Sequence, residues 1–157
     1  MIRVGLGVDA HAVEPERDLT IGGVAVPDAP GLAGHSDADV LSHAIADALL
    51  GAAGLGDLGS NFPATERWRD ALSLEILSET ARLLSDQGWS IGNLDATLIA
   101  EAPRLAPLIA EMRARIAEAL SIDDALVSVK VTSTDGLGFV GRREGLAAIA
   151  VALIEKP

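Results

Sequence analysis

All three histidines of this 157-residue chain lie in its first third, and two of them, with one aspartate, could bind a metal ion. Asp9 and His11 lie two residues apart in a segment with the alternation of a strand, so both side chains project to one face. His43 follows in a segment with helical spacing. One carboxylate and two imidazoles suit Zn²⁺ with an open fourth position. The alternative is that Asp9 ends a strand and that both histidines are ordinary solvated side chains.

Two acidic residues flank His43 on its predicted helix. Asp39 and Asp47 lie one turn before and one turn after it. Because carboxylates often orient metal-bound imidazoles, either residue could hold the ring of His43.

Two other segments could bind phosphate groups. His35 and Ser36 precede the helix, where free N–H groups and the helix dipole favour an anion, although Ser36 could equally be a simple cap. Residues 132–138 follow a predicted strand and are rich in hydroxyls and backbone donors, and Asp135 could hold a hard divalent cation. No Gly-Lys-Ser/Thr follows, so this is not a Walker loop, and an ordinary polar loop is the alternative.

The elements that position these residues can be predicted from hydrophobic periodicity and turn residues. We expect strands over about 2–11, 89–100 and 127–132, a β-ribbon around Gly22-Gly23, and helices over about 38–50, 72–84 and 107–120. Ser36-Asp37-Ala38-Asp39 fits a capping box. Residues 54–69 have the composition of a functional loop, and 146–154 fit neither period cleanly.

Composition narrows the class of protein. The length predicts a single domain over residues 1–157, and 49% hydrophobic residues exclude disorder. The net charge of -11 argues against binding nucleic acid or an anionic membrane, and the absence of cysteine excludes thiolate metal sites and Cys nucleophiles. With no signal-peptide pattern and no apolar run long enough to span a bilayer, we expect a soluble, cytoplasmic protein. The high apolar content suggests oligomerisation.

Together these features indicate metal-assisted phosphate chemistry. Several longer sequence segments point to a specific enzyme family. They are Gly7-Val8-Asp9-Ala10-His11, Ile21-Gly22-Gly23, His35-Ser36-Asp37, His43, Asp47 to Ala53, Gly56-Asp57-Leu58-Gly59, Phe62-Pro63, Ala100 to Pro103, Lys130-Val131-Thr132 and Leu137 to Arg142. With these strings in this order, essentially the whole chain resembles the 2-C-methyl-D-erythritol 2,4-cyclodiphosphate synthase family.

The resemblance implies a lyase of the non-mevalonate isoprenoid pathway. In such enzymes the 2-phosphate of 4-diphosphocytidyl-2-C-methyl-D-erythritol 2-phosphate attacks the β-phosphate, expels CMP and closes a cyclodiphosphate ring. By resemblance, Asp9, His11 and His43 would bind one Zn²⁺ per chain, and Asp135 would hold Mg²⁺ or Mn²⁺ with the substrate. His35 and Ser133 would be catalytic, stabilising the transition state.

The resemblance also implies a set of substrate-binding residues. Some would contact the phosphates, the sugar or the cytosine: Asp9, His11, His35, Ser36, Asp57, Leu58, Gly59, Phe62, Pro63, Ala64, Thr65, Glu66, Ala100, Glu101, Ala102, Pro103, Arg104, Leu105, Ala106, Thr132, Ser133, Thr134, Asp135, Phe139 and Arg142. Four positions depart from the family's usual residues: Asp135 and Ser133 replace Glu and Thr, Arg104 replaces Lys, and Leu72 replaces an Asp before Ser73. We expect Leu72 to alter only local packing.

The implied fold is α+β: a four-stranded mixed sheet with helices on one face, a C-terminal strand, and a homotrimer around a threefold axis with active sites between adjacent subunits. Two alternatives remain. A zinc-dependent phosphoester hydrolase would use the open metal position to activate water. A non-catalytic metabolite-binding trimer would keep the fold without the reaction.

Overall fold

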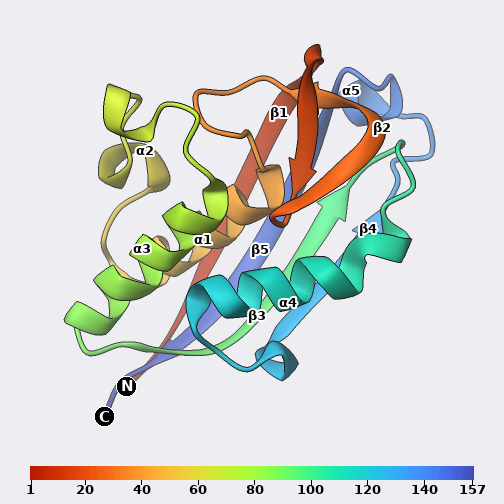
Figure 1. Ribbon diagram of the computed structural model, residues 1–157. Coiled ribbons are helices and arrows are strands. Elements are labelled where there is room, and N and C mark those ends of the chain that lie inside the picture. The colour runs from red at the N-terminus through yellow and green to blue at the C-terminus, as the bar shows by residue number, and fades with distance from the viewer.

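The computed structural model describes residues 1–157 as a mixed sheet covered on one face by helices (Figure 1). The strands are β1 (Ile2–Ile21), β2 (Val24–Leu32), β3 (Ser90–Ile99), β4 (Val127–Thr132) and β5 (Gly145–Glu155). The helices are α1 (Val40–Ala53), α2 (Leu58–Asn61), α3 (Ser73–Asp86), α4 (Ile109–Leu120) and α5 (Gly138–Gly141), with 3₁₀ turns at Glu66–Trp68, Ala106–Leu108 and Asp124–Leu126.

The sheet has five strands in the order β2-β1-β5-β3-β4, so the expectation of four strands is wrong. All neighbours are antiparallel except β3 and β4, which makes the sheet mixed as expected. The difference lies in β1, which does not stop near His11. It pairs with β5 through Ala12 and then continues from Val13 as the partner of β2. The ribbon around Gly22-Gly23 is therefore part of the main sheet.

The C-terminal segment is a strand because its small residues alternate. Ala148, Ala150 and Ala152 face the helices and are fully buried. In the register of the antiparallel pair, Gly5 and Gly7 of β1 lie beside Ala152 and Ala150. These small residues make a flat floor, and α1 lies directly on it.

Two glycines of this floor are required by the close approach of α1. A Cβ at Gly7 would overlap the carbonyl oxygen of Ala44, and one at Gly5 would overlap that of Ala48. Any side chain at either position would lift the helix from the sheet. Because Asp9 and His11 continue the same face of β1, this contact determines how near His43 comes to them.

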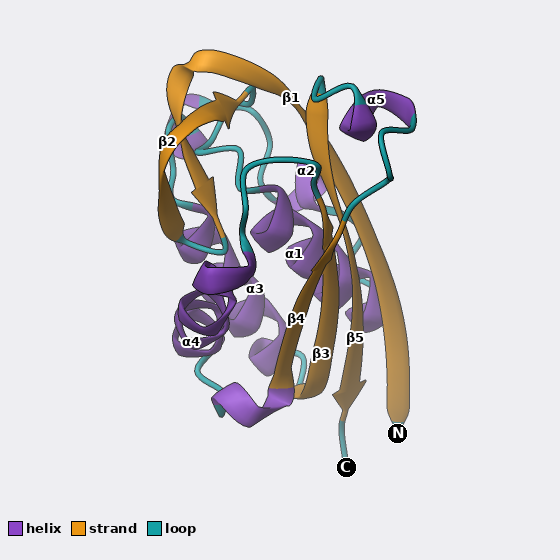
Figure 2. Ribbon diagram, turned by 90° about the vertical axis from the view of Figure 1, so that its right-hand side faces the viewer, coloured by secondary structure: helices purple, strands orange, loops and turns teal.

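The opposite face of the sheet has no helix over it (Figure 2). There β1 exposes the apolar side chains of Ile2, Val4, Leu6 and Val8, and β5 exposes Ile149 and Val151. A contiguous apolar face of this kind is characteristic of a surface that another protein chain covers. None of the helices has the length and apolar character needed to span a membrane.

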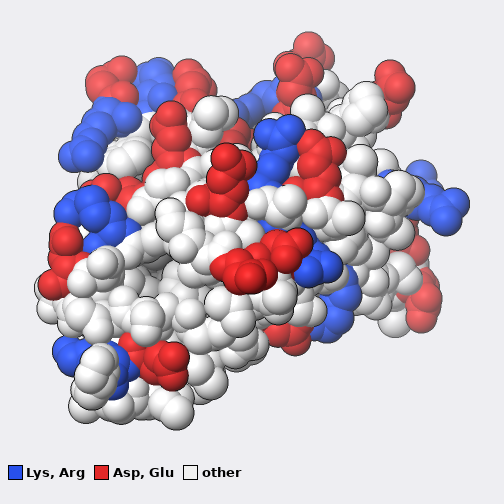
Figure 3. Space-filling view, turned by 60° about the horizontal axis from the view of Figure 1, so that its bottom comes forward, with Lys and Arg blue, Asp and Glu red and all other residues white.

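Acidic and basic side chains are interspersed over the face shown in Figure 3, with no continuous basic patch. Ion pairs within helices join Arg82 to Glu79 and Asp86, and Arg115 to Glu111. This face offers no continuous cationic surface for a nucleic-acid backbone.

The sequence had indicated that residues 54–69 form a loop, but part of this segment is helical. Asp57 caps α2 by accepting a hydrogen bond from the backbone N–H of Ser60 at 2.7 Å, while the Ser60 hydroxyl accepts from the N–H of Asp57. A reciprocal capping box of this kind stabilises even a single helical turn. The segment thus has local order of its own.

Candidate active site

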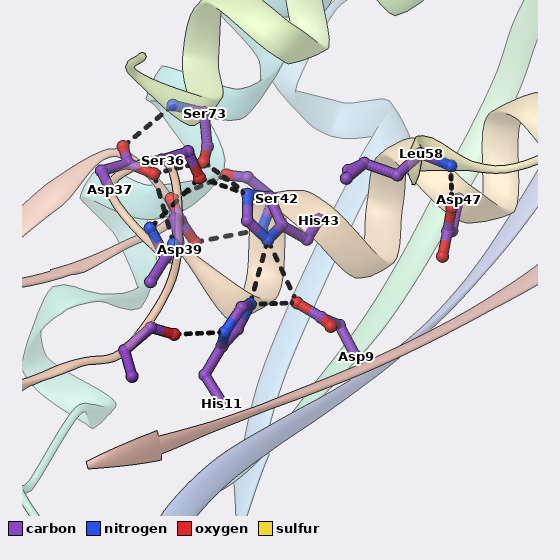
Figure 4. A network of polar contacts seen from close by, with 12 residues as sticks. Asp9, His11, Ser36, Asp37, Asp39, Ser42, His43, Asp47, Leu58 and Ser73 are labelled. Carbon is purple, nitrogen blue, oxygen red and sulfur yellow. Dashed lines mark hydrogen bonds and ion pairs between the residues drawn. The ribbon is translucent and has the colours of Figure 1, made fainter. Parts of the chain in front are cut away.

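Asp9 and His11 on β1 meet His43 on α1 at the end of the floor described above (Figure 4). Asp9 Oδ2 lies 2.8 Å from His11 Nε2 and 3.1 Å from His43 Nδ1. The two imidazole nitrogens are 3.1 Å apart. The structure therefore brings together the three ligand candidates that the sequence had indicated, and their donor atoms point to one place.

The electrostatics of this cluster favour a positive charge at its centre. Burial disfavours the Asp9 carboxylate, but hydrogen bonds and charges from His11 and His43 outweigh it and hold the pKa of Asp9 well below its usual value. Burial likewise disfavours a charged His11, yet the hydrogen bond and charge of Asp9 raise the pKa of His11. A carboxylate and two imidazoles that attract positive charge fit a divalent cation.

The carboxylates on either side of His43 do not orient its ring, so that expectation is wrong. Asp39 accepts hydrogen bonds from the N–H groups of Gly22, Gly23 and Ser42 and from the Ser42 hydroxyl. Asp47 accepts from the N–H of Leu58 at 2.6 Å. Both carboxylates point away from the imidazole of His43 and instead accept hydrogen bonds from the backbone of neighbouring segments.

Two serine hydroxyls contact the ring of His43 instead. Ser73 Oγ lies 2.9 Å and Ser36 Oγ 3.1 Å from His43 Nε2. Sequence reasoning noted Ser73 only as the neighbour of Leu72 and did not place it in the site. No local spacing relates residue 73 to residue 43, and only the packing of α3 against α1 brings them together.

Asp39, and not Ser36, is the N-cap of the first long helix. Its side chain accepts from the N–H of Ser42, three residues on, and α1 begins at Val40. The sequence pattern suggested a capping box that starts at Ser36, three residues before the observed N-cap. Ser36 is therefore free of the capping role and faces His43.

A pocket of about 270 Å³ opens beside the three ligand candidates. Its lining includes nine residues that the sequence had indicated: Asp9, His11, His35, Ser36, His43, Leu58, Gly59, Phe62 and Ala64. Trp68 and Ile76 complete it and were not predicted. Ile76 has the spacing of a core helix residue, and Trp68 lies in a 3₁₀ turn that composition alone could not show.

The loop with His35 is held in place at both ends. Arg17 donates to the carbonyl oxygens of Gly34 and Ser36, each at 2.5 Å. His35 Nε2 lies 2.9 Å from the carbonyl oxygen of Thr65, which joins this loop to the segment after α2. An exposed histidine is thereby kept at the rim of the pocket.

A second pocket, of about 280 Å³, lies at the ends of β3 and β4. It is lined by Ala100, Glu101, Ala102, Pro103, Arg104, Leu105, Ala106, Val131, Thr132 and Ser133. All but Val131 belong to the predicted substrate-binding set. Glu101 accepts from the backbone N–H of Thr134 at 3.2 Å, so the two predicted segments contact each other.

Other predicted residues line neither pocket. Asp57, Pro63, Thr65 and Glu66 flank the first pocket in the chain, and Thr134, Asp135, Phe139 and Arg142 lie around the loop after β4. Asp135 is exposed, and its carboxylate accepts from the Ser133 hydroxyl at 3.2 Å. Arg142 is paired with Glu144 at 2.9 Å. Asp135 belongs to no cluster of three or more potential metal-ligating side chains within its own chain.

Comparison with known proteins gives one consistent answer. A family model described as the YgbB family matches residues 2–155. A Listeria monocytogenes relative named 2-C-methyl-D-erythritol 2,4-cyclodiphosphate synthase is 54% identical over 157 residues, which cover 99% of this chain and 100% of the relative.

Solved structures agree with the sequence comparison. The bifunctional IspDF from Campylobacter jejuni matches with a TM-score of 0.95 at 37% identity, over 100% of this chain and 43% of that longer one. IspF of Plasmodium falciparum, solved as a CDP complex, matches with a TM-score of 0.87 at 31% identity, over 99% of this chain and 97% of that one.

Proposed function

The chain belongs to the YgbB family, and from that premise we propose that it catalyses the 2-C-methyl-D-erythritol 2,4-cyclodiphosphate synthase reaction. The substrate is 4-diphosphocytidyl-2-C-methyl-D-erythritol 2-phosphate, and the enzyme is a lyase of isoprenoid biosynthesis by the non-mevalonate route. The observation that carries the proposal is the convergence of Asp9, His11 and His43 at a pocket that also includes His35 and Ser36.

Asp9, His11 and His43 would hold one Zn²⁺ and leave a position open toward the pocket. Asp135 would hold Mg²⁺ or Mn²⁺ when substrate is present. Such cations polarise phosphate oxygens and neutralise the charge that accumulates during phosphoryl transfer. This answers how a protein with a net charge of -11 binds an anionic substrate.

The reaction needs no nucleophile from the protein. An oxygen of the substrate's 2-phosphate forms the new bond to the β-phosphorus, and the bond from that phosphorus to the CMP oxygen breaks with its electron pair leaving on CMP. The chain contains no cysteine, and its contribution is to position the two phosphates. His35 and Ser36 would do this at the first pocket, and Ser133 at the loop after β4.

The sugar and the base would bind at different pockets. Asp57, Leu58 and Gly59, with residues 62–66, would hold the methylerythritol. The pocket formed by residues 100–106 would bind cytosine, largely through backbone groups, with Thr132, Thr134, Phe139 and Arg142 near the diphosphate. The CDP complex of the Plasmodium falciparum relative supports a cytidine nucleotide as ligand.

A homotrimer with active sites between adjacent subunits fits these observations. The first pocket and the residue 100–106 pocket share no lining residue, which supports a site completed by the neighbouring subunit. The exposed apolar face of β1 and β5 would be covered by the other two chains. We propose further that residues 1–157 act as one domain in the cytoplasm.

A substrate analogue tests the proposal against the hydrolase alternative. The analogue lacks the 2-phosphate but keeps the cytidine, the diphosphate and the methylerythritol. The cyclase should bind it and release no CMP, whereas zinc-loaded enzyme with the true substrate should release CMP. Steady CMP release from the analogue would mean that water is the nucleophile. Binding without turnover of either compound would favour the non-catalytic alternative.

A further inference from the structure

We propose that Ser73 is a positioning residue for the metal site, and that Asp37 acts through it. Together they set the orientation and tautomer of the His43 imidazole, so that its Nδ1 lone pair points to Asp9 and His11. This inference rests on the proposed metal site, but its first premise is the geometry of the side chains themselves.

The contacts form a chain from a carboxylate to the imidazole (Figure 4). The Ser73 hydroxyl donates to Asp37 Oδ1, and the Ser73 backbone N–H donates to Asp37 Oδ2 at 2.9 Å. Ser73 Oγ lies 2.9 Å from His43 Nε2. Ser73 is fully buried, and His43 is 7% exposed, so water does not compete for these contacts.

The direction of each hydrogen bond follows from the number of protons available. A serine hydroxyl has one hydrogen to donate, and an ionised carboxylate has none. Since the Ser73 hydrogen goes to Asp37, its oxygen can only accept from His43. With a cation at Asp9 and His11 in place of the proton that Asp9 otherwise accepts from Nδ1, the proton of the neutral imidazole would therefore lie on Nε2, which leaves the lone pair on Nδ1 for the cation. Nδ1 is the atom that faces Asp9 and His11.

Ser36 has a different position although it also lies near Nε2. Its Oγ is 3.1 Å from that nitrogen, and it accepts from the N–H of Ala38 at 3.3 Å. No carboxylate fixes its hydroxyl hydrogen, and it lines the pocket, whereas Ser73 does not. The geometry therefore assigns the holding of the ring to Ser73 and leaves Ser36 available to a ligand.

The start of α3 explains why Asp37 is available to Ser73. Leu72, at the N-cap, has no side chain that can accept from the helix. Asp37 supplies this acceptor from the loop before α1, and its N–H donates to the carbonyl oxygen of Ala71 at 3.2 Å. The cap of α3 and the orientation of His43 thus depend on the same carboxylate.

Zinc affinity of the full-length chain tests the inference, measured by competition with a chromophoric chelator. Ser73→Ala should bind zinc about 10- to 100-fold more weakly than wild type, the range typical for groups that orient metal ligands. Ser73→Thr keeps the hydroxyl and should recover most of the affinity. Ser36→Ala should lose less affinity than Ser73→Ala.

Ser42→Ala is the matched control. Ser42 is also fully buried, also donates its hydroxyl to a carboxylate, at 2.8 Å from Asp39 Oδ2, and is adjacent to His43 in the chain. Its hydroxyl does not contact the imidazole. Ser42→Ala should therefore lower stability like Ser73→Ala while leaving zinc affinity within about twofold of wild type, because only the orienting contact governs the metal ligand.

A second measurement separates this inference from the proposed metal function. Nitrogen-15 NMR of His43 in the full-length chain without added zinc should show a proton on Nε2 although Asp9 competes for one at Nδ1, and Ser73→Ala should shift the proton toward Nδ1. A wild type with its proton on Nδ1 alone, or equal zinc affinity of Ser73→Ala and Ser42→Ala, would overturn the inference. A wild type that binds no zinc but carries the proton on Nε2 would contradict the metal site and still support the orienting contact.

Discussion

The metal cluster and the loop after β4 are built in contrasting ways. At the cluster, Asp9, His11 and His43 come from β1 and α1, and every buried polar side-chain atom of the chain has a partner. In the loop, Ser133 and Asp135 are exposed and bond mainly to each other. A single chain therefore preorganises its proposed metal ligands. The residues proposed to contact phosphate and nucleotide remain exposed, and a substrate or a neighbouring subunit would have to complete their contacts.

The largest loss of stability and zinc binding should follow a substitution in the floor of small residues on which α1 lies. In Gly7→Ala the new Cβ would overlap the Ala44 carbonyl, and α1 would have to move away from Asp9 and His11. We expect a loss of about 3 kcal/mol or more in the free energy of unfolding, together with loss of zinc binding. Urea unfolding and zinc analysis measure the two effects.

Gly51→Ala is the control for that substitution. Gly51 lies in α1, and a Cβ there meets no atom within 4 Å. Because alanine favours a helix, this variant should gain roughly 0.5 to 1 kcal/mol and keep its zinc. Equal stability of the two variants would contradict the role given to the contact between β1 and α1.

The next largest effects should be on zinc content and turnover, and they should differ between the metal cluster and the loop after β4. His43→Ala should reduce zinc from about one per chain to near none without unfolding the protein, because two ligands hold zinc poorly.

Asp135→Asn should retain full zinc but slow CMP release by roughly 100-fold, with a smaller change in substrate binding, since its cation acts mainly on the developing charge. Zinc analysis and single-turnover kinetics distinguish the two variants. Loss of zinc from Asp135→Asn would contradict the separate roles given to the metal cluster and the loop after β4.

The cap shared by α3 and His43 should give a smaller, double effect. Asp37→Ala removes the acceptor for both the N–H and the hydroxyl of Ser73. We expect a loss of about 2 kcal/mol in stability together with weaker zinc binding. Asp123→Ala is the control, because Asp123 caps an exposed 3₁₀ turn by accepting from Ala125 and lies outside both pockets. If Asp123→Ala also binds zinc more weakly, the loss of zinc binding in Asp37→Ala would reflect reduced stability and not the contact with Ser73.

The smallest effect should be a pH dependence at Asp47. Burial, with the charges of Asp57 and Asp9, raises the pKa of Asp47 above 3.8, although the hydrogen bond from Leu58 opposes this. The folded protein therefore binds this proton more tightly than the unfolded chain, so the contribution of Asp47 to stability is complete below 3.8 and is lost as the pH rises through the raised pKa.

Asp47→Asn tests that sign. An amide oxygen can still accept from Leu58 but carries no charge, so the variant should be more stable than wild type at pH 7. The gain should be less than about 1 kcal/mol because the group is partly exposed and screened. It should shrink in urea titrations as the pH falls toward 4. A gain that grows on acidification would contradict the assignment.

Most elements could be predicted from local patterns, whereas for the candidate metal cluster local spacing left an alternative open and the family resemblance selected the three ligands. The alternation of β1 places Asp9 and His11 on one face, and the stripe of α1 places His43 toward the sheet. The contacts that failed prediction are those between distant segments. Ser73 reaches His43 only through helix packing, and Asp37 caps a helix that begins at residue 73. The fifth strand was missed because β1 changes partner after Ala12, and the loss of alternation at residues 14–16 with register shifts before Leu19 hides its continuation.

The most direct test of the central claim is turnover of the true substrate in ¹⁸O-labelled water by the zinc-loaded full-length protein with Mg²⁺. If the 2-phosphate of the substrate is the nucleophile, mass spectrometry should find the cyclic diphosphate and CMP in equal amounts, both without ¹⁸O. An uncyclised phosphate product that carries one ¹⁸O would show that water attacked the β-phosphorus, and would contradict the account.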